Sequence, residues 1–232
     1  MTDATFLQSF LQVYPHFGWI GSLIILTGCL VSAVAYTGKA DERYSILNHF
    51  ISELGEIGIS RSAAVFNTAM VIGGILFIPY MVGLGLTIGS WWAIIGMSAG
   101  LLAAVSSILV GIFSMDRLTP HRRAAMTFFR SGLVTVVFFT IAVFAQPAGH
   151  RTIPLVVNMF GIIAIISYAA FLAIVGRKMD TNNQPNYILD PSVMPERPKF
   201  WRTAFLEWML FFSTIAWFLL VSLFVLGPQI VV

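Results

Sequence analysis

The chain has 232 residues, of which 58% are hydrophobic and only 10% are charged, and its formal net charge is +3 at pH 7. Soluble domains carry about 25% charged residues, so this composition excludes a soluble globular protein. The four His and single Cys show no zinc-type spacing, and no phosphate-binding or dinucleotide-binding motif is present. Nothing indicates nucleic-acid binding, and the sequence assigns no metal or cofactor.

Six apolar segments are long enough to cross a bilayer as helices, since about 20 residues span the hydrocarbon core. Backbone polar groups cannot stay unpaired in lipid, which favours helices over strands. We predict spans at residues 14–36, 64–88, 91–113, 124–146, 153–175 and 203–226. The sequence therefore predicts an all-α integral membrane protein, a six-transmembrane-helix bundle that forms one polytopic domain over residues 1–232.

Basic residues are concentrated on one side of this predicted bundle. All but Arg130 and Arg151 of the 13 Lys and Arg residues lie in the connections after the first, third and fifth spans. The positive-inside rule places these connections in the cytoplasm and both termini outside, in an inner or plasma membrane. The longest connection, 177–202, is polar and rich in proline, and we interpret it as a cytoplasmic linker.

The segment 44–57, between the first two spans, shows helical periodicity. A helix there would place apolar residues on one face and Glu53 on the border. The opposite face would carry Ser45, Asn48, His49, Ser52 and Glu56. Because the segment is too short to span a bilayer, we predict a short amphipathic helix at the cytoplasmic interface. Such a helix has one face in contact with water, and this alone would explain the polar residues without a functional site.

The connection after the third span carries further polar groups on the same side. Thr119 and Pro120 are typical of a helix start, and Asp116 and His121 flank them. They form either a tight turn with topogenic arginines or part of a site. Asn67, about one turn into the second span, lies on the same side.

Arg130 is the one basic residue inside a span. It lies eight residues after Arg122, hence roughly 12 Å deeper into the membrane. A charge at that depth costs several kcal/mol unless it pairs or reaches the interface, so such residues are functional candidates. Arg123 and Arg130 share a helix face. The candidate partners are Glu207, one turn into the sixth span, and Asp116 or Glu53, and the alternative is that Arg130 snorkels to the interface.

Four short motifs resemble an uncharacterised prokaryotic membrane family with a domain of unknown function. They are N-x-x-I-S-E-L-G at 48–55, V-F-N at 65–67, G-I-F-S-M-D at 111–116, and His121 with a following Phe-Phe pair. The chain is also distantly similar to the Frag/DRAM/Sfk family, whose signature has Asp where Glu53 stands here. The resemblance implies a six-span bundle and roles in lipid remodelling or lipid asymmetry, and it supplies no mechanism.

The leading hypothesis is therefore a lipid-handling protein whose cytoplasm-facing polar pocket binds an anionic headgroup. Arginines would hold a phosphate, because charge-assisted hydrogen bonds to guanidinium groups are strong. The predicted ligand-binding residues are Asn48, His49, Ser52, Asn67, Arg122, Arg123, Arg130 and Glu207. Membrane lipids are the expected partners.

Three other functions stay open. A membrane-embedded hydrolase or transferase would use His as base and a carboxylate as orienter, with candidates His49, Glu53, Asp116 and His121. An accessory or scaffold subunit would bind other membrane proteins. A transporter would need a broken helix, which Pro79 and the Gly pair at 73–74 suggest in the second span.

Overall fold

The computed structural model describes residues 3–38, 41–147, 151–179 and 197–226 and contains helices but no strand in these ranges. The long helices are α1 (Asp3–Val34), α2 (Ala63–Ile88), α3 (Trp91–Ile112), α4 (Leu118–Phe144), α5 (Asn158–Met179) and α6 (Arg202–Leu226). All six contain a stretch that is long and apolar enough to cross a membrane. This confirms the predicted six-helix membrane protein. Most of the predicted linker 177–202 lies outside the described residues.

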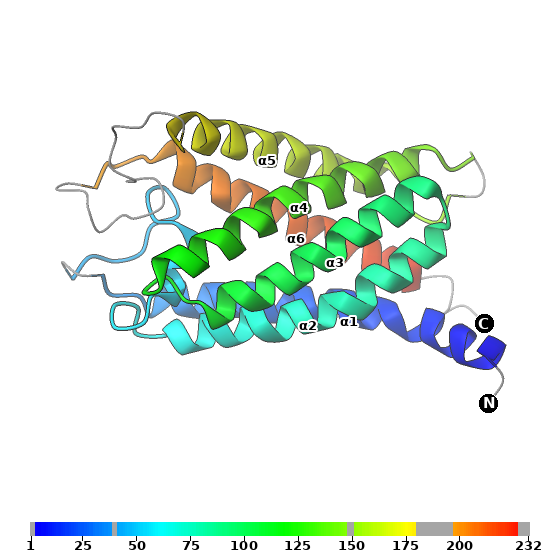
Figure 1. The fold of residues 1–232 in the computed structure, drawn as a ribbon, viewed down its shortest axis with the longest axis horizontal. Coiled ribbons are helices and arrows are strands. Elements are labelled where there is room, and N and C mark those ends of the chain that lie inside the picture. The colour runs from blue at the N-terminus through cyan, green and yellow to red at the C-terminus, as the bar shows by residue number, and fades with distance from the viewer. Residues whose placement is uncertain (1–2, 39–40, 148–150, 180–196, 227–232) are drawn as a thin grey trace.

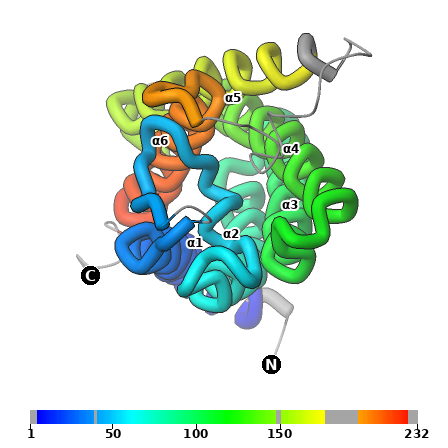
Figure 2. Tube along the Cα trace, turned by 90° about the vertical axis from the view of Figure 1, so that its left-hand side faces the viewer, coloured from blue at the N-terminus to red at the C-terminus, as the bar shows by residue number. Residues whose placement is uncertain are grey.

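The six helices form a closed ring. Each helix packs against the next one along the chain, and α6 returns to pack against α1 (Figures 1 and 2). Short connections favour antiparallel neighbours, so this order follows directly from the chain. The last residues of α1, α3 and α5 and the first residues of α2, α4 and α6 lie together at one end of the ring, and most of the described basic residues are at or near this end (Figure 1). Which side of the membrane this end faces stays a prediction.

The second span is one continuous helix, so the predicted interruption is absent. Pro79 lies inside α2 without ending it. The two glycines before it serve close packing instead, because a Cβ at Gly73 would strike Ile25 of α1 and a Cβ at Gly74 would lie 2.8 Å from the Ala104 carbonyl oxygen of α3. The broken-helix argument for a transporter therefore has no support in α2.

The predicted amphipathic helix over 44–57 does not form. The chain makes a turn at 46–48 and then the five-residue 3₁₀ helix η1 (Ile51–Gly55). The expected polar face does not form either, since His49, which it should carry, is buried. The physical reason is that polar side chains of this segment find partners inside the protein, and those contacts outweigh helical periodicity.

Close approach of α1 and α2 generates a test of the fold. A Cβ at Gly83 would overlap the fully buried Tyr14 ring, whereas a Cβ at Gly176 would meet nothing. We expect Gly83→Ala to lower stability by about 1–3 kcal/mol, as overpacking does. Gly176→Ala should be neutral or stabilising by up to about 1 kcal/mol, because it lowers the entropy of the unfolded chain. Thermal unfolding of both variants in one detergent measures the difference, and equal melting temperatures would contradict this packing.

Candidate functional site

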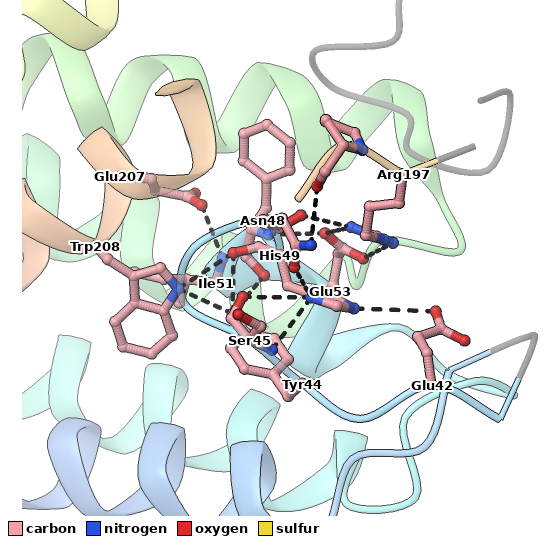
Figure 3. A network of polar contacts seen from close by, with 12 residues as sticks. Glu42, Tyr44, Ser45, Asn48, His49, Ile51, Glu53, Arg197, Glu207 and Trp208 are labelled. Carbon is pink, nitrogen blue, oxygen red and sulfur yellow. Dashed lines mark hydrogen bonds and ion pairs between the residues drawn. The ribbon is translucent and has the colours of Figure 1, made fainter. Parts of the chain in front are cut away.

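Residues 41–60, here called the cap segment, lie across one end of the ring (Figure 2). Its 3₁₀ helix η1 contacts α1, α2 and α6. A short, irregular segment in this position must satisfy its backbone groups by other means than a regular helix. Residues of the segment itself supply most of these partners, and Arg197, Glu207 and Trp208 supply others from α6 and the stretch before it (Figure 3).

A buried ion pair anchors the cap segment. The Arg197 guanidinium donates to the Glu53 carboxylate at 2.7 and 3.1 Å, and it also donates to the Asn48 carbonyl oxygen at 2.8 Å (Figure 3). The Glu53 side chain is 2% exposed. Asn48 adds a second link through its amide, which donates to the Pro198 carbonyl oxygen at 2.9 Å. Bidentate geometry makes this the strongest class of ion pair.

The cap segment is also bound to α6. The Ile51 N–H donates to Glu207 Oε2 at 2.7 Å, and the Trp208 indole N–H donates to the Tyr44 hydroxyl at 3.0 Å (Figure 3). Tyr44 in turn donates to the Phe50 carbonyl oxygen at 2.8 Å. Together these contacts hold the cap backbone against the first two turns of α6.

Burial sets the protonation of His49. Its Nδ1 lies 2.8 Å from Asn48 Oδ1, and its Nε2 lies 3.9 Å from Glu42 Oε1. Burial and the nearby Arg197 charge lower the pKa of His49 to about 4. The ring is therefore neutral near pH 7. Burial raises the pKa of the Glu53 carboxyl, while the hydrogen bonds from Arg197 oppose that rise.

Inside the ring lies an elongated apolar cavity of about 100 Å³. Its lining on α4 runs from His121 to Val136, which corresponds to about 20 Å along the helix. The hydroxyls of Ser107, Thr135 and Thr214 face this wall but already donate to helix carbonyl oxygens. They add little free hydrogen-bonding capacity, so the wall is apolar along most of its length.

The imidazole and the carboxyl group that line the cavity, those of His121 and Glu207, lie with Ser52 at the end beneath the cap segment. A smaller pocket of about 20 Å³, here called the outer pocket because its lining reaches the start of α4 at Leu118, shares these three residues and adds Arg122. The two pockets are therefore neighbours that share part of their walls. This arrangement has a polar end and an apolar body.

The structure divides the predicted ligand-binding residues into three groups. Ser52, Arg122 and Glu207 line the cavity or its outer pocket. Asn48, His49 and Asn67 instead stabilise the cap segment, Asn67 by donating to the Gly55 carbonyl oxygen at 3.0 Å. The last group is Arg123 and Arg130.

Arg123 and Arg130 share a face, as expected, but it is the outer face of α4. Both are exposed. Within the described residues neither forms an ion pair, so the predicted pairing of Arg130 with Glu207 does not form. Helix geometry explains this, because Arg130 lies about 80° around the axis from Arg122 but only about 20° from Arg123.

The four candidate catalytic residues are not gathered into one arrangement. His49 and Glu53 belong to the cap contacts, whereas Asp116 is exposed and accepts a hydrogen bond from Ser114. Only His121 lines the cavity. Among the residues that the structure describes, no group of three or more His, Cys, Asp or Glu could hold a metal.

Sequence reasoning missed three residues that hold the site together, namely Tyr44, Arg197 and Trp208. In the sequence Arg197 is one of the basic residues of the connection after the fifth span, and no local pattern marks Tyr44 or Trp208. Their partners are more than 140 positions away in the chain. The sequence offers one signal, namely the Arg and Trp residues near the start of the sixth span, but it indicates no partner for them.

The fold and cavity define the class of this protein: a six-helix polytopic membrane protein with an internal, polar-ended cavity. The chain belongs to the family described as Protein of unknown function (DUF998), whose model matches residues 20–224. That range includes the cap segment and the whole cavity lining. No curated protein and no solved structure matches the chain. The membership confirms the predicted family of unknown function, and the similarity to Frag/DRAM/Sfk stays a prediction.

The buried ion pair leads to a first prediction for the site. Removing Arg197 leaves the Glu53 carboxylate buried and unpaired, which costs about 3–5 kcal/mol in comparable pairs. Because the Arg197 side chain is 22% exposed, we expect the lower end of that range. Arg197→Ala should therefore lower the thermal unfolding temperature in detergent. Lys199→Ala, an exposed basic residue two positions on, is the matched control, and an equal effect of both would contradict the anchoring role.

The low pKa of His49 predicts how stability depends on pH. The unfolded chain binds a proton near pH 6.5, whereas the folded protein does so only near pH 4. Stability is thus fully present above pH 6.5 and is lost as pH falls toward 4, by at most about 1.4 kcal/mol per pH unit. Chemical denaturation at pH 7 and at pH 5 measures how much the free energy of unfolding falls between them, and this fall should be smaller for His49→Gln than for the wild type. An equal fall in both proteins would show that His49 is not the group responsible.

Proposed function

We propose that this protein binds a membrane lipid inside the helix ring, with a hydrocarbon chain in the cavity and an anionic headgroup beside Arg122. The observation that carries the proposal is the polarity of the cavity. It is apolar along its length, and Ser52, His121 and Glu207 are gathered at one end. Ligand sites are typically apolar with a few placed polar groups that fix orientation.

The shape of the cavity supports a linear chain. Its lining follows the helices for about 20 Å, between wall positions such as Met81 and Phe218 toward one end and Glu207 at the other. Burying hydrocarbon there contributes about 0.8 kcal/mol per CH₂ relative to water. A membrane lipid gains less, since its chain already lies in hydrocarbon. The headgroup contacts must therefore supply the selectivity.

Arg122 is the residue placed to bind an anionic headgroup. It lines the outer pocket, next to the three polar residues of the cavity. A guanidinium matches phosphate or carboxylate geometry with two parallel hydrogen bonds. The positive-inside rule applied to the basic end of the ring places this headgroup in the cytoplasmic leaflet. Arg123 and Arg130 lie on the outer face and are left out of the proposed site.

The proposal is tested by native mass spectrometry of protein extracted gently from its membrane. We expect an anionic lipid bound to the wild type and to Arg123→Ala, and at least tenfold less bound to Arg122→Ala, since a charge-assisted hydrogen bond contributes about 1.5–3 kcal/mol. Arg123 is the matched control because it is the adjacent, exposed arginine. Equal lipid on all three proteins would overturn the headgroup assignment.

A second pair of variants tests the part of the cavity that we propose holds the hydrocarbon chain of the lipid. Ala103 lines the cavity, whereas its neighbour Leu102 is 52% exposed on the outer surface. Ala103→Phe should fill the cavity and displace the lipid, and Leu102→Phe should not. If neither variant binds less lipid than the wild type, the lipid lies elsewhere. A wild type that carries no lipid and co-purifies with another membrane protein would instead support the accessory-subunit interpretation.

A further inference from the structure

A second group of polar side chains lies between α4, α5 and α6, away from the cap segment. Thr140, Asn158 and Trp217 come from these three helices and are 4%, 0% and 0% exposed. Among the described residues, Thr140 Oγ1, Asn158 Oδ1 and Trp217 Nε1 have no hydrogen-bond partner. Buried polar atoms without a partner are rare in native proteins because each one is costly, so these three require an explanation.

The three side chains come together around Gly161 of α5. A Cβ added to Gly161 would lie 2.6 Å from Thr140 Oγ1 and 3.2 Å from Trp217 Nε1. Asn158 lies three residues earlier on the same face of α5, and its Nδ2 donates to the Thr140 carbonyl oxygen at 3.4 Å. Because the Thr140 hydroxyl and the Trp217 indole nitrogen both lie so close to one point, a single small molecule can bridge them.

These three residues, here called the inter-helix site, are separate from the proposed lipid site. None of them lines the apolar cavity or the outer pocket. A hydrocarbon chain in the cavity also has no hydrogen bond to offer them. Whatever satisfies the inter-helix site is therefore a different ligand, and its assignment does not depend on the proposed function.

The chemistry of the three atoms determines the class of that ligand. The indole N–H of Trp217 only donates, the Thr140 hydroxyl either donates or accepts, and the free atom of Asn158 is the acceptor, because its NH₂ group already faces a carbonyl oxygen. A cation would face the indole N–H, and an anion would face the amide oxygen, so neither matches the set. A small neutral molecule that both donates and accepts hydrogen bonds matches it.

We propose that Thr140, Asn158 and Trp217 form a binding site for one water molecule that joins α4, α5 and α6. The water accepts from Trp217 Nε1–H and donates to Asn158 Oδ1, and the Thr140 hydroxyl makes the third hydrogen bond. Three is the number that a buried water typically makes, and its partners are typically groups that otherwise have none. Glycine at position 161 keeps a side chain out of the site.

A crystallographic or cryo-electron microscopy map of the full chain that shows ordered water tests the proposal directly. We expect one water peak at hydrogen-bonding distance, about 2.7–3.2 Å, from Trp217 Nε1 and Thr140 Oγ1. Gly161→Ala should lose this peak, because its Cβ would crowd the Thr140 hydroxyl, whereas Gly176→Ala on the same helix should keep it. A map of the wild type with other buried waters but none at this site would overturn the proposal.

Thr140→Val separates a hydrated site from a dry one by the sign of its effect on stability. Valine keeps the branched shape of threonine and removes only the hydroxyl. Removing a hydroxyl without a partner would leave the melting temperature unchanged or raise it, whereas removing one that binds the water loses a hydrogen bond. We expect the melting temperature of the purified full chain in detergent to fall by about 2–4 °C. An unchanged or higher melting temperature would overturn the proposal.

The double variant tests whether both positions act through the same water. Once Gly161→Ala has displaced the water, the Thr140 hydroxyl has no hydrogen bond to lose, so adding Thr140→Val should not lower the melting temperature further. Added to the control variant Gly176→Ala, Thr140→Val should cause its full fall. Equal falls in both backgrounds would overturn the shared site. If Gly161→Ala does not fold, the map of the wild type and the effect of Thr140→Val alone still decide.

Discussion

Two carboxylates hold adjacent backbone N–H groups of the cap segment. Glu53 Oε1 accepts from Phe50 at 2.7 Å, and Glu207 Oε2 accepts from Ile51 at 2.7 Å (Figure 3). An irregular segment at the end of a membrane bundle leaves backbone donors that water cannot reach, and each one left unpaired would be costly. These two carboxylates satisfy that constraint. They also determine where the cap ends and the cavity begins, because Ile51 and Glu207 both line it.

Glu53 and Glu207 differ in their partners, and this difference distinguishes a structural role from a candidate ligand-binding role. Glu53 is neutralised by Arg197 and belongs to the support of the cap. Glu207 has the Ile51 N–H and otherwise faces the cavity. One side chain therefore has its hydrogen-bonding capacity used by the protein, while the other has one carboxyl oxygen with no hydrogen-bond partner among the described residues. The same division applies to the histidines, since His49 is enclosed in the cap and His121 faces the cavity.

Much of the fold was predictable because lipid imposes a simple rule on sequence. Any segment that crosses must be long, apolar and helical, and all six predicted spans are helices in the structure. The cap segment was predictable in place but not in conformation. Its helical periodicity is real, yet burial of Glu53 beside Arg197 outweighs what that periodicity contributes, and a five-residue 3₁₀ helix results.

The sequence by itself determined the membrane class, the six spans, the shared face of Arg123 and Arg130, and the family resemblance. Only the tertiary structure decided that this face points outward and that Arg122, one position away, lines a pocket. Adjacent helical residues differ by about 100° around the axis, so which of them faces inward depends on the rotation of α4 against its neighbours. Arg197 and Trp208 likewise acquired their roles from partners far away in the chain. Such contacts leave no local pattern, because helix packing and not spacing brings them together.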